Sequence, residues 1–190
     1  MARGQNLPKD LQLPVDETYL KSPGASQYPE ANAIFLSDDV TFEVQKDGST
    51  QYEEHDVIKV FTPTGVEEHK DFVRVYRTGL EKVEILRART ILPDGRVLEI
   101  PKSAFNDEPV FPGATSGPNK DLRKLSLRYP AVSPNSIVEF HVRTQRKPYL
   151  EGKWWAVSYV QNPDPMVRST FTIRLPEGSF VASATPGYED

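Results

Sequence analysis

The feature that most constrains this chain is a repeated β-strand pattern broken by turn-forming residues. Val40, Phe42 and Val44 alternate with polar residues, and residues 46–49 supply Lys, Asp, Gly and Ser for a turn. Alternation of this kind places successive side chains on opposite faces of a strand. The 17 prolines and the lack of sustained helical periodicity in the sequence argue against long helices. We therefore predict an all-β protein whose strands form an antiparallel β-sandwich.

Strand signals continue from Ala33 toward the C-terminus. The clearest hairpin places Pro93, Asp94 and Gly95 between two apolar runs. Proline presets one turn angle and glycine accepts the positive φ that a tight turn requires. The predicted strands cover residues 40–44, 52–61, 72–76, 83–91, 96–100, 122–129, 137–144, 153–160, 167–175 and 180–184.

Three local expectations depend on this pattern. In the strand at 83–91, we expect Val83, Ile85 and Ile91 to lie on one side. Residues 62–65, which read Thr-Pro-Thr-Gly, are predicted to form a turn. Residues 101–119 are rich in proline and glycine and are predicted to form one long loop, of a length that is usually functional or mobile.

The length of 190 residues suits one β domain with an extension. Residues 1–29 contain several prolines among polar residues, and we predict an extended, proline-rich lead-in there. Residues 30–190 are predicted to form a single β-sandwich domain. A chain of this size buries roughly 70% of its unfolded surface, which is enough for a substantial core.

Composition excludes several classes of function. The net charge of −4, with both signs interspersed, gives no broad basic surface for nucleic acid. No apolar run approaches the roughly 20 residues that span a bilayer, and residues 1–5 lack the apolar core of a signal peptide. The absence of cysteine excludes disulfides and thiol catalysis.

Three groupings resemble metal or acid–base sites. They are His55 with Asp56, His69 with Glu67, Glu68 and Asp71, and Glu139 with His141. Glu139 and His141 share one strand face, but a zinc site takes three or four ligands. We expect these groups to form a polar sheet face and expect no metal or cofactor, with metal-dependent hydrolysis by the three histidines as a remote alternative. No Gly-x-Ser-x-Gly elbow supports a serine nucleophile.

Aromatic residues gather near the C-terminal third. Trp154 and Trp155 are adjacent, so on a strand they face opposite ways, and Tyr149 lies close in sequence. Packing within the domain or against another domain is the expected role, and contact with a sugar or peptide is the alternative.

Several segments together resemble one known family. They are YPEANAIFL at 28–36, DGST at 47–50, HDVIKV at 55–60, TGVE at 64–67, ARTILPDGRV at 88–97, YPAV at 129–132 and SIVEF at 136–140. This series is similar to the domain of unknown function 3857 over about residues 28–175. Asn135 stands where the family often has glycine, and asparagine also tolerates the left-handed conformation.

The resemblance implies an architectural role. The family is typically the N-terminal β-sandwich of bacterial proteins that carry a transglutaminase-like, papain-like domain downstream, and these proteins are often exported or membrane-associated. Its fold resembles the non-catalytic N-terminal sandwich of zinc aminopeptidases. The downstream domain's Cys-His-Asp set has no counterpart in this cysteine-free chain. We therefore expect no enzyme activity in this chain and an extracytoplasmic location.

Two functions follow as hypotheses. The first is a non-catalytic accessory domain that packs against the downstream domain or orients its substrate, through a surface containing Trp154, Trp155, Phe111 and Tyr149. The second is an independent carbohydrate- or peptide-binding module that uses the aromatic residues and the long loop. The expected partners are accordingly the downstream domain, or a peptide or glycan.

Overall fold

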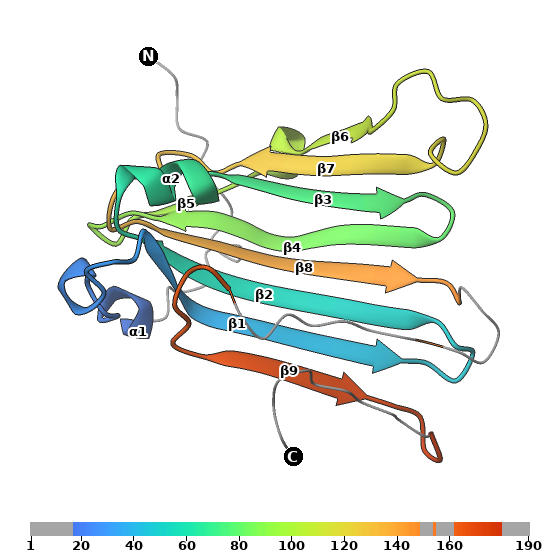
Figure 1. Ribbon diagram of the computed structural model, residues 1–190, viewed down its shortest axis with the longest axis horizontal. Coiled ribbons are helices and arrows are strands. Elements are labelled where there is room, and N and C mark those ends of the chain that lie inside the picture. The colour runs from blue at the N-terminus through green and yellow to red at the C-terminus, as the bar shows by residue number, and fades with distance from the viewer. Residues whose placement is uncertain (1–16, 149–153, 155–161, 180–190) are drawn as a thin grey trace.

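The computed structural model describes residues 17–148, 154 and 162–179, which fold into two β-sheets with short helices (Figure 1). The strands are β1 (Ala33–Val44), β2 (Thr50–Val60), β3 (Asp71–Arg77), β4 (Glu81–Ile91), β5 (Val97–Glu99), β6 (Asn106–Pro109), β7 (Leu122–Arg128), β8 (Ile137–Arg146) and β9 (Ser169–Arg174). The helices are α1 (Glu17–Leu20) and α2 (Pro63–His69), with 3-10 turns η2 (Ala25–Gln27) and η3 (Lys102–Ala104).

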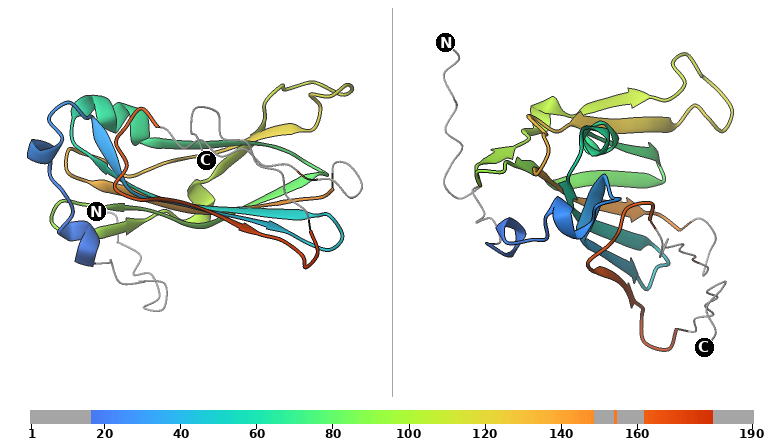
Figure 2. Two further views of the ribbon diagram at one scale, coloured as in Figure 1. Left: turned by 60° about the horizontal axis from the view of Figure 1, so that its bottom comes forward. Right: turned by 60° about the vertical axis from the view of Figure 1, so that its left-hand side comes forward.

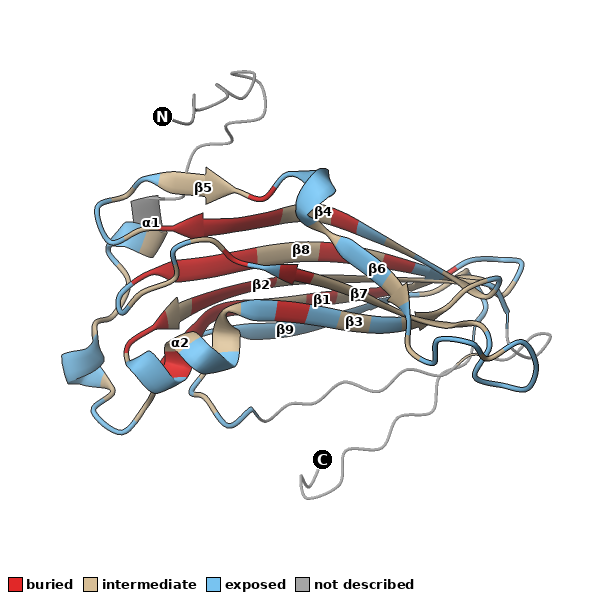
Figure 3. Cartoon of the chain, turned by 90° about the horizontal axis from the view of Figure 1, so that it is seen from above, coloured by how far each residue is buried: buried red, intermediate tan, exposed pale blue. Residues whose placement is uncertain are grey.

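The two sheets form the two layers of a sandwich (Figure 3). The larger sheet has six strands in the order β5-β4-β8-β2-β1-β9, and the smaller has the order β3-β7-β6. Strand pairs are antiparallel except β1 with β9, which run parallel. The predicted all-β sandwich is confirmed, and the parallel edge pair is a feature that the alternating pattern did not predict.

The main core lies between the sheets. We call the face of the six-stranded sheet toward the smaller sheet its inner face. Phe72 of β3 packs on Phe140 of β8 with ring centroids 4.9 Å apart. The buried members of this core are Ala33, Phe35, Ile58, Phe72, Ile85, Ala88, Ile100, Leu127, Tyr129, Val138 and Val142. Burial of these apolar side chains is the main stabilising contribution to the sandwich.

A second apolar cluster lies on the opposite, outer face, near one end of the six-stranded sheet. Its buried members are Ile34, Leu36, Val57, Phe61, Ile91 and Ile137. Tyr19, Tyr28 and Ala31 pack against it from the segment that precedes β1. The described part of the predicted lead-in lies beside this end of the large sheet (Figure 2). Its Tyr19 and Tyr28 side chains therefore cover the cluster. Lys59 Nζ also donates hydrogen bonds to the carbonyl and hydroxyl oxygens of Ser22, at 3.2 and 3.0 Å.

A β-bulge in β4 overturns one expectation. The pairing of β4 with β8 shifts register between Ile85 and Arg87. One extra residue reverses the faces that follow, because side chains alternate with a period of two. Ile85 therefore lies in the inner core, and Ile91 lies in the outer cluster. The prediction that both residues share one side was wrong, and the bulge turns Arg87 and Arg89 outward.

Helix α2 replaces the turn predicted at residues 62–65. Thr62 Oγ1 accepts a hydrogen bond from the Gly65 amide at 3.1 Å, and Pro63 occupies the first turn. These residues are an N-terminal cap and a favoured first helical position, rather than a complete turn. A Cβ on Gly65 would lie 2.3 Å from the Asn32 carbonyl oxygen, so glycine lets the helix approach the chain before β1.

The predicted loop at 101–119 is partly structured. It contains η3 and the short edge strand β6, which pairs with β7. The strand predicted at 180–184 lies outside the described residues, as does the strand at 153–160 apart from Trp154, which is not in a strand. Within the described part of the chain, no helix has the length and apolar character needed to cross a membrane.

Candidate functional site

A groove at the C-terminal end of α2 is the most promising concave site. Its volume is about 770 Å³. The segment before β1, the end of α2 and the segment before β9 form its walls. The residues that line it are Gln27, Tyr28, Pro29, Glu30, Ala31, Asn32, Glu68, His69, Asn162, Pro163, Asp164 and Pro165.

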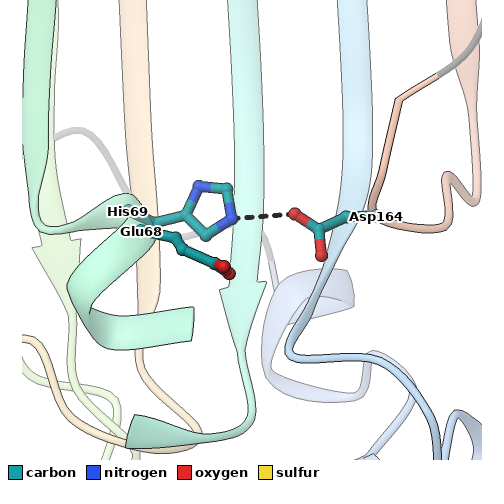
Figure 4. Close-up of side chains that lie close together, drawn as sticks. All are labelled: Glu68, His69 and Asp164. Carbon is teal, nitrogen blue, oxygen red and sulfur yellow. Dashed lines mark hydrogen bonds and ion pairs between the residues drawn. The ribbon is translucent and has the colours of Figure 1, made fainter. Parts of the chain in front are cut away.

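Three chemically active side chains converge in this groove (Figure 4). His69 Nε2 donates a hydrogen bond to Asp164 Oδ2 at 2.9 Å. The side chain of His69 is 15% exposed and that of Asp164 is 14% exposed. The Glu68 carboxylate is exposed and points into the same space. One ligand atom from each of the three residues lies within 4.8 Å of the others.

Local structure holds these groups in place. The His69 ring packs edge-on against Phe35, with centroids 6.1 Å apart. The backbone of Phe35 is also hydrogen-bonded to the segment before β9, which forms the opposite wall of the groove. The Phe35 amide donates to the Pro165 carbonyl at 2.9 Å, and the Phe35 carbonyl accepts from the Val167 amide at 2.8 Å. Asp164 lies between Pro163 and Pro165, and prolines restrict both their own backbone and that of the preceding residue.

The sequence found only part of this group. Glu68 and His69 were placed together by adjacency, but Glu67 instead pairs with Lys70, and Asp71 pairs with Arg128 at 2.7 Å. Asp164 was missed because it lies 95 residues from His69 in the chain. No spacing rule links two such distant positions.

A second ionic group lies on the outer face of the six-stranded sheet around the fully buried Glu139. Its carboxylate accepts hydrogen bonds from His55 Nε2 at 2.9 Å, Arg87 at 3.0 Å and Arg89 at 2.5 Å. Burial acts to raise the pKa of Glu139, but the hydrogen bond from His55 and the charge of Arg89 outweigh it and lower that pKa to about 2. Glu139 is therefore an ionised structural partner.

The predicted face shared by Glu139 and His141 is present, and it also contains His55. The His55 and His141 rings lie 5.0 Å apart, and His141 Nε2 donates to Glu53 at 2.7 Å. Burial lowers the pKa of His141. His69 contacts Phe35 on the inner side instead, so the fold does not bring the three histidines together.

Asp56 is a buried acid on the inner face. It faces Asp38 across the β1–β2 pair, and Oδ1 has no hydrogen-bond partner among the described residues. Burial, followed by the charges of Glu54 and Asp38, raises the pKa of Asp56 to about 9. His55 and Asp56 point to opposite faces, because successive side chains of a strand alternate.

The four aromatic residues named from the sequence are only partly described. Trp154 is half-buried against Phe42 of β1, with ring centroids 5.6 Å apart. Phe111 is 47% exposed in the loop after β6. Trp155 and Tyr149 lie outside the described residues. The interface role of this set stays a prediction.

Edge strand β9 exposes two further apolar side chains. Phe171 and Ile173 are 38% and 40% exposed. They lie beside the buried Val40 and Phe42 in the parallel pairing with β1. Together with Trp154 they form what we call the β9 patch, on the inner face of the large sheet.

The family described as Domain of Unknown Function with solved-structure structure (DUF3857) matches residues 46–189. The chain belongs to this family. The resemblance noted in the sequence is thereby confirmed, and the match includes Glu68, His69 and Asp164. No curated protein sequence matches the DUF3857 chain.

Two solved structures are similar to this chain in fold to different degrees. The chain is similar to a crystal structure of a "putative protease" from Parabacteroides distasonis ATCC 8503, with a TM-score of 0.67 and 20% identity. That match covers 77% of this chain and only 29% of the other. A CBM3a-L domain from scaffoldin CipA of the Clostridium thermocellum cellulosome matches 68% of this chain and 79% of that domain, at 13% identity. Its TM-score of 0.34 is too low to carry an argument.

Proposed function

We propose that this DUF3857 chain is a non-catalytic accessory β-sandwich that packs against a transglutaminase-like catalytic domain in the same polypeptide. The observation that carries the proposal is the unequal coverage of the structural match. Most of this chain corresponds to less than a third of a longer protein, 77% against 29%. A fold that recurs as one part of a longer chain is suited to supporting a neighbouring domain.

The chemistry of the described side chains supports an accessory role. On the outer sheet face, His55 is hydrogen-bonded to Glu139 and His141 to Glu53, so these side chains are already engaged with one another. With no cysteine in the chain, thiol chemistry must come from elsewhere in the polypeptide. We further propose an extracytoplasmic location, which rests on the family resemblance.

The docking surface that we propose is the β9 patch. Phe171 and Ile173 are exposed at the edge of the large sheet, beside Phe42 and its contact with Trp154. Aromatic side chains buried at the centre of an interface often contribute much of its binding energy, and burial of neighbouring apolar surface adds to it. The partner that we assign to the patch is the catalytic domain, since the chain continues from β9 toward its C-terminal end.

The natural coding sequence gives the first test. We expect a domain with a Cys-His-Asp set beyond residue 190 and a signal peptide ahead of residue 1. A coding sequence without the catalytic domain would contradict the proposal.

Binding in trans tests the docking surface. The downstream domain, produced separately, should bind this chain, and Ile173→Asp should weaken binding at least about tenfold, or about 1.4 kcal/mol. Val75→Asp is the matched control, because Val75 is an exposed aliphatic residue on β3 of the other sheet. Equal losses in the two variants, measured by calorimetry, would argue against the β9 patch.

The alternative of a peptide- or glycan-binding module is favoured by the groove of about 770 Å³ at the end of α2, where Tyr28 offers an aromatic side chain. A glycan array and peptide titrations followed by tryptophan fluorescence test this alternative. Lack of any hit would remove it.

A further inference from the structure

We propose that Glu68, His69 and Asp164 form a binding site for a divalent transition-metal ion, with zinc as the preferred ion. The site joins the C-terminal end of α2 to the segment that leads into β9. It is independent of the proposed docking function, because its ligands lie in the groove rather than on the β9 patch.

The donor atoms fit the preferences of zinc. Imidazole nitrogen and Asp or Glu carboxylate oxygen are both established ligand types for Zn²⁺. Ca²⁺ takes six to eight oxygen ligands and Mg²⁺ prefers oxygen ligands and water, so a nitrogen ligand favours the later transition ions. Three protein ligands beside an open groove leave a fourth position for water or another ligand.

The distances require little rearrangement. Zinc–ligand bonds of about 2.0–2.2 Å place tetrahedral ligand atoms about 3.4 Å apart. His69 Nε2 and Asp164 Oδ2 are 2.9 Å apart, so binding requires these atoms to separate by a fraction of an ångström. Zinc would take the place of the proton that Nε2 shares with Asp164, and that proton would leave to solvent, with the ring keeping its other proton on Nδ1. The ligand atom of Glu68 lies within 4.8 Å of both, and its exposed side chain is free to turn toward them.

The local charge also favours a cation. Lys70, the nearest basic residue in sequence, is already paired with Glu67. Within the described residues, the Glu68 carboxylate has no ion pair, and Asp164 is paired only with His69. A divalent ion bound here would be held by the two acidic side chains, Glu68 and Asp164, together with the imidazole.

Packing and hydrogen bonds hold His69 and Asp164 in place without a bound ion. The His69 ring packs against Phe35, and that residue is also hydrogen-bonded to the backbone of Pro165 at 2.9 Å. Asn162 Oδ1 accepts a hydrogen bond from the Asp164 amide at 3.3 Å, in a proline-restricted segment. A site whose ligands are already oriented loses less conformational freedom on binding.

Calorimetric titration of the full 190-residue chain with zinc chloride is the direct test. We expect one ion per chain and no comparable binding of magnesium. His69→Gln and Asp164→Asn should weaken zinc binding by about 100-fold, and Glu68→Gln by about tenfold. Zinc should also raise the unfolding temperature of the native chain, because it binds only the folded arrangement.

Glu67→Gln is the matched control, since it makes the same substitution one residue from Glu68, at a carboxylate that is not in the cluster. It should keep native affinity. Cobalt in place of zinc should give tetrahedral visible absorption bands that the His69→Gln chain lacks. Absence of zinc binding, equal losses in Glu67→Gln and Glu68→Gln, or magnesium binding as tight as zinc would overturn the proposal. Glu68 is exposed, so Glu68→Gln should fold like the native chain. Its loss of zinc binding therefore tests the site even if His69→Gln or Asp164→Asn folds poorly.

Discussion

The two faces of the six-stranded sheet each bury a carboxylate, and the two acids behave in opposite ways. On the outer face, Glu139 is surrounded by His55, Arg87 and Arg89, and its pKa falls to about 2. On the inner face, Asp56 faces other acids, and its pKa rises to about 9. Burial raises the pKa in both places, so the partners decide which form is present.

The difference arises from side chains that share each face. Residues two apart on a strand point the same way, which places Glu54 beside Asp56. On the outer face, the bulge in β4 turns both arginines toward Glu139. The outer face therefore stabilises an ion pair in a buried position, whereas the inner face favours a neutral acid.

The largest predicted effect is the loss of the buried outer pair. Arg89→Met should leave Glu139 without its closest cation and destabilise the fold by about 3–5 kcal/mol. Urea unfolding measures the change. Arg96→Met is the control, because the Arg96–Asp94 pair is 73% and 53% exposed and should contribute under about 1 kcal/mol. Similar losses in both variants would break the comparison between buried and exposed pairs.

The second largest effect is a loss of stability at low pH, when Glu139 becomes protonated. The pKa of Glu139 is lowered from 4.5 to about 2, so its contribution is present above pH 4.5 and is lost as the pH falls toward 2. We expect Glu139→Gln to be less stable than the native chain at neutral pH by about 2–3 kcal/mol. That gap should close between pH 4.5 and 2 in urea titrations. A gap that is constant with pH would show that ionisation of Glu139 does not contribute.

The inner acid should show the opposite pH dependence. The pKa of Asp56 is raised from 3.8 to about 9, so its contribution is present below pH 3.8 and is lost as the pH rises through 9. Asp56→Asn cannot ionise, and it should exceed the native chain in stability by about 1–3 kcal/mol at alkaline pH.

Asp47→Asn serves as the control for the inner acid. Asp47 is exposed, and hydrogen bonds from Ser49 lower its pKa. This substitution should give no alkaline gain in unfolding experiments. A native chain whose stability is flat from pH 4 to 9 would contradict the assignment of Asp56.

The smallest expected change in stability concerns the segment before β1 that packs on the outer apolar cluster. Lys59→Met removes the hydrogen bonds to Ser22 and should destabilise the fold by about 0.5–1.5 kcal/mol. Because the lost contacts lie at the edge of the apolar cluster, hydrogen exchange should increase mainly in residues 17–31. Exchange that rises equally in β3 and β7 would point to a global rather than a local change.

Much of the sandwich follows from sequence, because alternation is a local property. The pattern at Val40, Phe42 and Val44 lies within β1, and the hairpin at 93–95 joins β4 to β5. The bulge after Ile85 was not predictable, since the extra residue has no turn chemistry and is defined only by pairing with β8. Thr62 and Pro63 carried a helix-start signal that was interpreted as a turn.

The candidate site was less accessible to sequence reasoning. Adjacency found Glu68 and His69, and strand spacing found Glu139 with His141. Asp164 joins its partner through the backbone contact between Phe35 and Pro165, which depends on the whole path of the chain. A single sequence holds no signal for contacts of that kind.

The parallel edge strand has a consequence for the order of folding during synthesis. Its hydrogen bond from Ser169 to Asp38 joins residues 131 apart, whereas the other described strand pairs involve residues no later than Arg146. A ribosome releases the chain from its N-terminus, so those pairs can form before β9 emerges. During that interval the open edge of β1 can pair with strands of other nascent chains, and the arrival of β9 closes it.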